Sequence, residues 1–274
     1  MTLRDLALDT LAGPMETYFS PGARARAEGL QARLRSADAF FTSRLKVGPS
    51  FHLAILTEAD WAAVSPMPYG FSFVSDTPHV VVLPAAPERA IVAEIYRAAR
   101  PGLPSEAAQT LARLGISYDE AVAQVSDFIA FHELGHVYVE EVGFRDAARW
   151  LEEILATYVA YSFLQAREPD AIATWNALSA AIVGHIQPAS RSLDDFNRLY
   201  TALGPETYGW FQSHFNLRVA AVVEQRREAS WLAELQTAGF LRNTRSVPTS
   251  QLLTRLDRLV PVFSVWAVTL ARTP

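Results

Sequence analysis

Two histidines and a glutamate stand close together in the stretch FHELGH, residues 131–136. On a helix, residues four apart lie on the same face, so His132 and His136 can direct their imidazoles at one metal ion. Zinc is the metal that most often takes this pair of ligands. Glu133 lies one position around the helix, where its carboxylate can accept a proton from an attacking water and return it to a leaving amine. These residues predict a metal-dependent hydrolase.

The sequence around this motif predicts a long, buried helix. Ser117 and Glu120 form the pattern of a capping box, which starts a helix at Tyr118, and Gly143 supplies a stop. Apolar residues recur between them at helical spacing: Val122, Val125, Phe128, Ile129, Leu134, Val137 and Val139. Histidine and glutamate are costly in such a helix unless something binds them. The alternative, two satisfied core histidines beside a surface glutamate, explains neither the spacing nor the burial.

A catalytic zinc normally has three protein ligands, so the two histidines need a third. The extended pattern H-E-x-x-H-x-x-G-x-x-H would supply it, but its glycine and histidine positions hold Val139 and Val142 here. The next helical stretch, residues 150–158, is apolar almost all round and contains Glu152 and Glu153. A glutamate in such a helix needs a partner, and both are candidates for the third ligand.

Side-chain spacing favours Glu153 over Glu152. Ala156 and Thr157 follow Glu153 by three and four residues, and Ala160 lies one turn further. These small residues would let the helix approach the motif helix closely, and Thr157 could hydrogen-bond a ligand histidine. Glu152 gains no polar support of this kind, and we expect it to be solvated or to support the ligands from behind.

This arrangement resembles the gluzincin metallopeptidases. They carry H-E-x-x-H on one helix and a glutamate ligand on the next, often with a small residue three positions later and an aspartate four positions later. The matching residues are His132, Glu133, His136, Glu153 and Ala156. Thr157 stands where aspartate is common, and the separation of His136 from Glu153 is a little short. The match covers residues 132–161.

The resemblance implies a mostly helical α+β protein of zincin-like architecture. Residues 1–143 would form an α/β lobe with a small sheet and the motif helix at the lobe junction, and residues 144–274 an all-helical lobe that supplies the glutamate. Strands are predicted at residues 50–56, 70–75 and 79–83, and helices at 23–46, 58–64, 88–99, 118–143, 150–158, 170–182, 192–203, 206–238 (with a possible break) and 249–259. In gluzincins an edge strand beside the metal holds an extended peptide by main-chain hydrogen bonds. Either residues 71–74 or 79–83 would have this role.

A zinc peptidase also needs a donor that stabilises the oxyanion. Families of this kind use a tyrosine or histidine from the helical lobe, and the candidates are Tyr208, Tyr200 and His214, followed by His185. Tyr208 leads because it belongs to the aromatic cluster at residues 208–211, although a core tyrosine with a satisfied hydroxyl would explain the cluster too. His79 opens a strand beside a proline, and we interpret it as a strand-end histidine and not a ligand.

Composition excludes several other classes of protein. The chain has 274 residues, half of them apolar, which can bury a large core. A net charge of −5 without a basic stripe argues against nucleic-acid binding. The absence of cysteine excludes disulfides and thiolate metal ligands. The longest apolar run, residues 259–271, is interrupted by Pro261 and predicts a buried C-terminal helix, not a membrane span. The first fifteen residues do not resemble a signal peptide, so a cytoplasmic location is expected.

The sequence thus predicts a zinc-dependent metallopeptidase with one zinc ion per chain and a peptide or protein as substrate. A different class of function remains open: a zincin-shaped binding or regulatory protein whose metal has a structural role. Zinc-dependent hydrolysis of another amide bond is a further alternative. Glu133 favours catalysis because a structural site has no need of that carboxylate. The sequence gives no indication of the oligomeric state.

Overall fold

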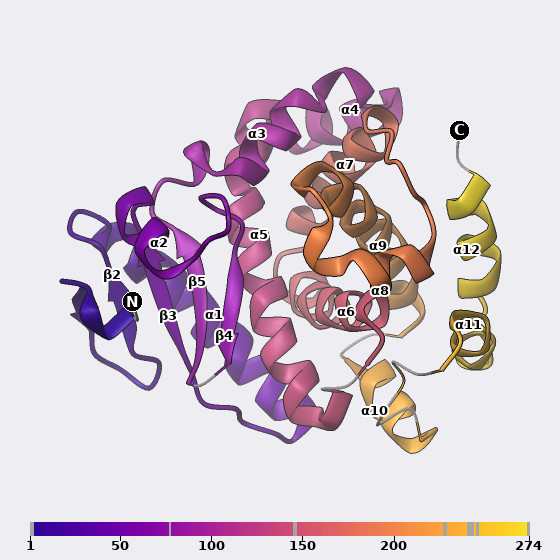
Figure 1. Ribbon diagram of the computed structural model, residues 1–274, viewed down its shortest axis with the longest axis horizontal. Coiled ribbons are helices and arrows are strands. Elements are labelled where there is room, and N and C mark those ends of the chain that lie inside the picture. The colour runs from indigo at the N-terminus through magenta and orange to yellow at the C-terminus, as the bar shows by residue number, and fades with distance from the viewer. Residues whose placement is uncertain are drawn as a thin grey trace.

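A small β-sheet with flanking helices occupies the first part of the chain, and helices alone make up the rest (Figure 1). The computed structural model describes residues 3–76, 78–144, 147–226, 229–239, 244 and 247–272. The protein is mostly helical, with one five-stranded sheet, which confirms the expected α+β class.

The sheet has the strand order β1-β2-β3-β5-β4. Its strands are β1 (Asp9–Leu11), β2 (Thr17–Phe19), β3 (Phe51–Leu56), β4 (Phe73–Asp76) and β5 (His79–Pro84). The central three are parallel, and β1 and β4 pair antiparallel with their neighbours. The three strands expected from the sequence are confirmed, but β1 and β2 were not anticipated. Of the two segments expected as edge strand, only β4 lies at an edge. The alternative at residues 79–83 is wrong because β5 is paired on both sides.

Successive side chains of the central strands β3 and β5 point to opposite faces of the sheet, and both faces are buried. Leu53, Ile55, Val81 and Leu83 join the main core. On that side the sheet packs against α1 (Arg24–Leu45) and α5 (Tyr118–Val139). Ala54, Leu56, Val80 and Val82 pack on the other side around Trp61 of α2 (Glu58–Val64). Both α1 and α2 have close to the predicted bounds.

Helix α5 runs between the sheet and the helical half of the molecule (Figure 1). Its predicted capping box is present: the Glu120 backbone N–H donates to the Ser117 hydroxyl, and the Ser117 N–H donates to the Glu120 carboxylate. The helix gives way to a π-type turn at Glu140–Phe144, where Gly143 has φ of 100°. Two further helices lie between β5 and α5 in the chain. These are α3 (Ile91–Ala98), which is shorter than predicted, and α4 (Ser105–Leu114), which was not anticipated.

The helical half is built around α6 (Arg149–Arg167), which is buried on almost every side. Helices α7 (Pro169–His185) and α9 (Pro205–Gln225) pack against it and against each other. Between them lie α8 (Leu193–Leu199) and a 3-10 turn, Tyr200–Ala202. The segment predicted to be helical over residues 206–238, with a possible break, contains the two helices α9 and α10 (Ser230–Thr237). Residues 227 and 228, between them, lie outside the described part of the chain.

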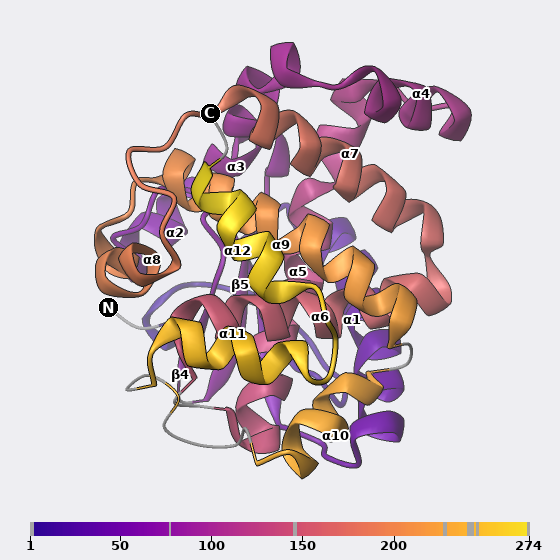
Figure 2. The same cartoon turned by 90° about the vertical axis from the view of Figure 1, so that its right-hand side faces the viewer.

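Helices α11 (Thr249–Asp257) and α12 (Phe263–Arg272) form an outer layer over this half (Figure 2). The C-terminal helix is only partly buried, which corrects the prediction made from its apolar sequence. Phe263 and Trp266 pack inward, whereas Val265 and Val268 are 76% and 50% exposed. In the described residues, no helix combines the length and apolar character that a membrane crossing needs.

Candidate metal centre

The centre forms where α5 and α6 come into close contact. Gly135 lies between the two motif histidines, directly against the backbone of Ala156 in α6. A Cβ atom at Gly135 would overlap the Ala156 carbonyl oxygen and lie within 3.0 Å of the carbonyl carbon and the Cα atom. Only glycine therefore permits this approach, which places the histidines of α5 opposite the glutamate of α6.

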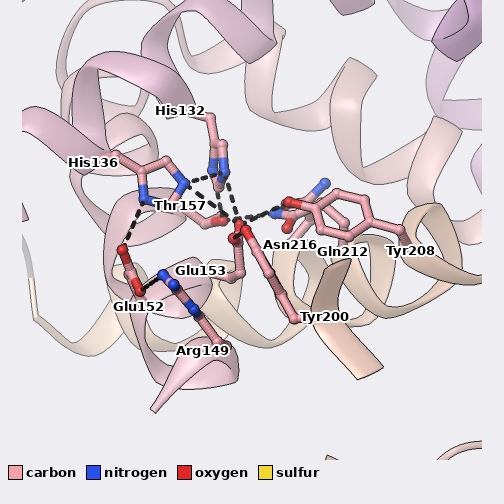
Figure 3. A network of polar contacts seen from close by, with 10 residues as sticks. All are labelled: His132, His136, Arg149, Glu152, Glu153, Thr157, Tyr200, Tyr208, Gln212 and Asn216. Atoms are coloured by element: carbon pink, nitrogen blue, oxygen red, sulfur yellow. Dashed lines mark hydrogen bonds and ion pairs between the residues drawn. The ribbon is translucent and has the colours of Figure 1, made fainter. Parts of the chain in front are cut away.

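Three ligand atoms converge at this contact (Figure 3). The Nε2 atom of His132 lies 3.1 Å from Oε2 of Glu153 and 3.1 Å from Nε2 of His136. The third side of the triangle, from His136 Nε2 to Glu153 Oε2, measures 3.5 Å. In the part of the chain that the structure describes, these residues form the one group of three or more histidine, cysteine or acidic side chains that could hold a metal ion.

The donor set fits a zinc ion. Two imidazole nitrogens and one carboxylate oxygen are a common ligand set of catalytic zinc sites, which keep a further position for water or substrate. His132 and Glu153 are only 5% and 1% exposed, so these polar groups would be costly to bury without a bound cation or an equivalent partner. The group could therefore hold a metal ion.

Without a metal, the same residues compensate each other as an ion pair. Burial opposes ionisation of Glu153, but the charge of His136 and hydrogen bonds from both histidines hold its pKa well below the usual range. Burial also opposes protonation of His136, but the negative charge of Glu153 outweighs it and raises the pKa of His136 to about 9. The ionised carboxylate of Glu153 therefore favours a positive charge at the neighbouring histidines.

Hydrogen bonds behind the ligands orient His132. Its Nδ1 atom lies 3.1 Å from the hydroxyl of Thr157, the contact expected from the sequence. The side-chain amide of Gln212, on α9, donates to the same hydroxyl over 2.9 Å. Such contacts fix the ring orientation of a ligand histidine. Gln212 was not anticipated, because it lies 55 residues from Thr157 and reaches it only through the docking of α9 on α6.

Glu152, the alternative ligand, lies on the outer side of His136. One of its carboxylate oxygens is 4.0 Å from His136 Nδ1, and the other accepts a hydrogen bond of 2.9 Å from Arg149. The structure therefore brings Glu153 to the histidine Nε2 atoms and leaves Glu152 behind one of the rings. This arrangement corresponds to the supporting role expected for Glu152.

Two tyrosines of the helical half reach Glu153 (Figure 3). The hydroxyl of Tyr200 donates to Oε1 over 2.6 Å, and that of Tyr208 donates to Oε2 over 3.0 Å. Burial and the charge of Glu153 raise the pKa of both phenols, so they remain protonated donors. The two histidines considered as oxyanion donors are not among these contacts. The ring centroid of His214 lies 4.2 Å from that of Trp210, and His185 is exposed at the end of α7.

Two cavities meet at Glu133, and we call them the inner and the outer cavity. The inner cavity lies between α3, α5, α7 and α9 and is mostly apolar. The outer cavity is the larger of the two and runs past β4, the end of α5 and the turn after α8. Residues that line both are Phe71, Ser72, Glu133 and Tyr208. Glu133 itself is 8% exposed, and burial raises the pKa of its carboxyl group.

His79 lies at the wall of the outer cavity, at the start of β5 as expected. Its Nε2 atom is 3.9 Å from the carboxylate of Glu140. It is not part of the group of three ligand residues. The interpretation of His79 as a strand-end histidine agrees with this position.

Comparison of the chain with protein-family models, with curated proteins and with solved structures finds no match. What the centre can do therefore has to be inferred from its own residues. The three candidate ligands are His132, His136 and Glu153, and the phenols of Tyr200 and Tyr208 donate hydrogen bonds to Glu153. Glu133 follows His132 in α5 and lines both cavities.

Proposed function

We propose that this protein is a zinc-dependent metallopeptidase of gluzincin-like architecture. The observation that carries the proposal is the convergence of His132, His136 and Glu153, with Glu133 at the junction of two cavities. The edge strand β4 contributes to the wall of the outer cavity through Phe73 and Val74. A site of this composition combines metal ligands, a proton acceptor and room for a substrate.

His132, His136 and Glu153 would hold the metal. A zinc ion at this position would polarise the scissile carbonyl and lower the pKa of a water molecule towards neutrality. Glu133 would accept the proton from the attacking water and deliver it to the leaving amine. Its position on α5, one residue from His132, would keep the carboxylate near the reacting atoms during both transfers.

Tyr208 would donate a hydrogen bond to the oxyanion. Its hydroxyl lies 3.0 Å from Glu153 Oε2, the carboxylate oxygen that also approaches both histidines, and so would be near an oxyanion formed at a metal held there. Tyr200 has a different role, because its hydroxyl bonds the other carboxylate oxygen. We assign to Tyr200 the orientation of Glu153.

The substrate would be a peptide in extended conformation. An edge strand offers unpaired main-chain groups on its outer side, and a peptide can add to them by backbone hydrogen bonds. β4 lies at such an edge beside the outer cavity. This arrangement favours a peptide over a small amide, while hydrolysis of another amide would require the same catalytic residues.

The decisive experiment measures zinc in the purified, zinc-supplied protein and in three variants, Glu153→Ala, Glu152→Ala and Glu133→Gln. We expect about one zinc per chain in the wild type, in Glu152→Ala and in Glu133→Gln, and loss of zinc in Glu153→Ala. Glu152→Ala is the matched control, since it removes the same charge one residue away. Absence of zinc in the wild type would refute the metal centre.

A second measurement separates catalysis from a structural or regulatory metal site. Zinc-loaded wild-type protein is incubated with a peptide library, and products are identified by mass spectrometry. We expect cleavage by the wild type and a loss of about 10²- to 10⁴-fold in Glu133→Gln, which keeps its zinc. Full zinc occupancy without cleavage of any peptide would favour the non-catalytic alternative.

A further inference from the structure

The inner cavity has the lining of a pocket for an apolar side chain. Its walls are mostly apolar, formed by residues such as Val92, Ile95, Ile129, Trp175 and Ile182. His132 and Glu133 also line it. A substrate residue next to the scissile bond could therefore place its side chain here.

The apolar lining contains two polar atoms whose hydrogen bonds are unmet. The hydroxyl oxygen of Ser72 and the amide oxygen of Gln212 are buried, and neither has a hydrogen-bond partner among the described residues. A buried polar group without a partner destabilises the protein unless a bound molecule supplies the missing hydrogen bond. Two such groups at one apolar pocket therefore indicate a ligand with an apolar body and a polar group.

The Gln212 amide narrows the choice of ligand. Its nitrogen donates to Thr157 and, over 3.1 Å, to Asn216, which leaves the oxygen as the unpaired end. If the two ends of the amide were exchanged, the unpaired atom would be a donor. A phenol hydroxyl satisfies either case because it both donates and accepts, and it can also bond the Ser72 hydroxyl. A phenylalanine side chain satisfies neither, and a tryptophan can only donate.

We propose that the inner cavity binds a tyrosine side chain of the substrate, on one side of the scissile bond, with Gln212 and Ser72 as the residues that recognise its hydroxyl. The proposal rests on the proposed peptidase function, whose active site supplies the scissile bond. Discrimination arises because a phenylalanine would leave both polar atoms buried and unpaired.

The test is a comparison of two peptides that differ only in tyrosine or phenylalanine at the residue beside the cleavage site. We expect the wild-type enzyme to cleave the tyrosine peptide with a kcat/KM about ten-fold higher or more. Gln212→Met and Ser72→Ala should each bring the ratio of the two kcat/KM values towards one. Using the ratio within each variant removes any general loss of activity caused by weaker support of His132 in Gln212→Met.

Ser75→Ala is the matched control for Ser72→Ala. Ser75 lies in the same strand region, its hydroxyl donates to the Pro78 carbonyl, and it does not line either cavity. The tyrosine-to-phenylalanine ratio of Ser75→Ala should therefore equal that of the wild type. A ratio near one in the wild type, or an unchanged ratio in both Gln212→Met and Ser72→Ala, would overturn the inference while leaving the peptidase function intact.

A binding measurement keeps the two proposals distinguishable. The same peptides are titrated into zinc-loaded Glu133→Gln protein, with and without Gln212→Met, and Kd values are measured by calorimetry. Tighter binding of the tyrosine peptide, lost in Gln212→Met, would support the pocket even if no peptide were cleaved. Equal Kd values for the two peptides would refute it.

Discussion

Replacing Gly135 by alanine tests whether the close contact of α5 and α6 creates the metal centre. In most exposed helical positions this substitution stabilises a protein by about 0.5–1 kcal/mol, because glycine loses more backbone entropy on folding. At Gly135 the new Cβ would instead overlap the backbone of Ala156. A backbone atom cannot rotate away as a side chain can, so α6 would have to move back by about 0.7 Å or more to open the distance between the Cβ and the Ala156 carbonyl oxygen from 2.3 Å to 3.0 Å.

The expected magnitude follows from these opposing effects. Overpacking in a dense core costs about 1–3 kcal/mol, which exceeds the gain in helix propensity. We expect a net loss of about 1–2 kcal/mol in the free energy of unfolding, and a fall in Tm of roughly 2–8 °C for a chain of this size. Since Glu153 moves with α6, we also expect zinc affinity to fall about ten-fold or more.

The assay is thermal unfolding of metal-free and zinc-loaded protein, combined with competition against a zinc chelator. Gly29→Ala is the matched control, because Gly29 is a helical glycine of α1 whose Cβ would meet nothing within 4 Å. Gly29→Ala should raise Tm slightly and leave zinc affinity unchanged. If Gly135→Ala behaved like Gly29→Ala in both measurements, the close contact would not position the ligands.

Three further predictions concern the cap of α5, the partly buried His214 of α9 and the tyrosines of the centre. Ser117→Ala removes an N-cap and should lower the free energy of unfolding by about 1 kcal/mol in denaturant titrations. Burial and the nearby arginines lower the pKa of His214 to about 4, so its unfolded form binds a proton first as pH falls below 6.5. Stability should therefore be lost between pH 6.5 and 4, by up to about 3 kcal/mol, and His214→Phe should flatten this part of the profile. Tyr208→Phe should lower kcat about 100-fold with zinc affinity unchanged, whereas Tyr200→Phe should weaken zinc binding about ten-fold.

Each of these predictions has a result that contradicts it. An unchanged denaturant midpoint of unfolding in Ser117→Ala would mean that water replaces the cap without loss of stability. If His214→Phe had the same pH dependence of stability as the wild type, the loss of stability at low pH would be caused by other groups. Equal losses of zinc affinity in Tyr200→Phe and Tyr208→Phe would remove the distinction drawn between the two phenols.

The residues of the motif and of the following helix could be predicted from the sequence because their placement depends on local rules. The capping box at Ser117 sets where α5 begins, and the four-residue spacing places both histidines on one face. Glu153 could be preferred over Glu152 from the small residues that follow it, since a close helix contact needs a small-residue ridge. The contribution of Gly135 to that contact was not recognised.

Features that depend on tertiary docking could not be predicted with the same precision. Tyr200 and Tyr208 were both candidates, but their hydroxyls meet Glu153 across 47 and 55 residues, and no local pattern shows that both would do so. β1 and β2 have three residues each, too few for a period of two to be visible. Identifying the edge strand required the strand order, which the sequence does not show.

The order of the centre along the chain has a consequence for folding. The ligands come from α5 and α6, two neighbouring helices, so their contact closes a short loop at small entropic cost. The phenols of Tyr200 and Tyr208 and the α9 wall of the inner cavity join only when distant segments dock. We expect a chain emerging during synthesis to be able to bind an ion once α6 is complete, before it can hold a substrate. Binding of the metal would then precede the docking of the remaining helices and would stabilise the partly folded chain.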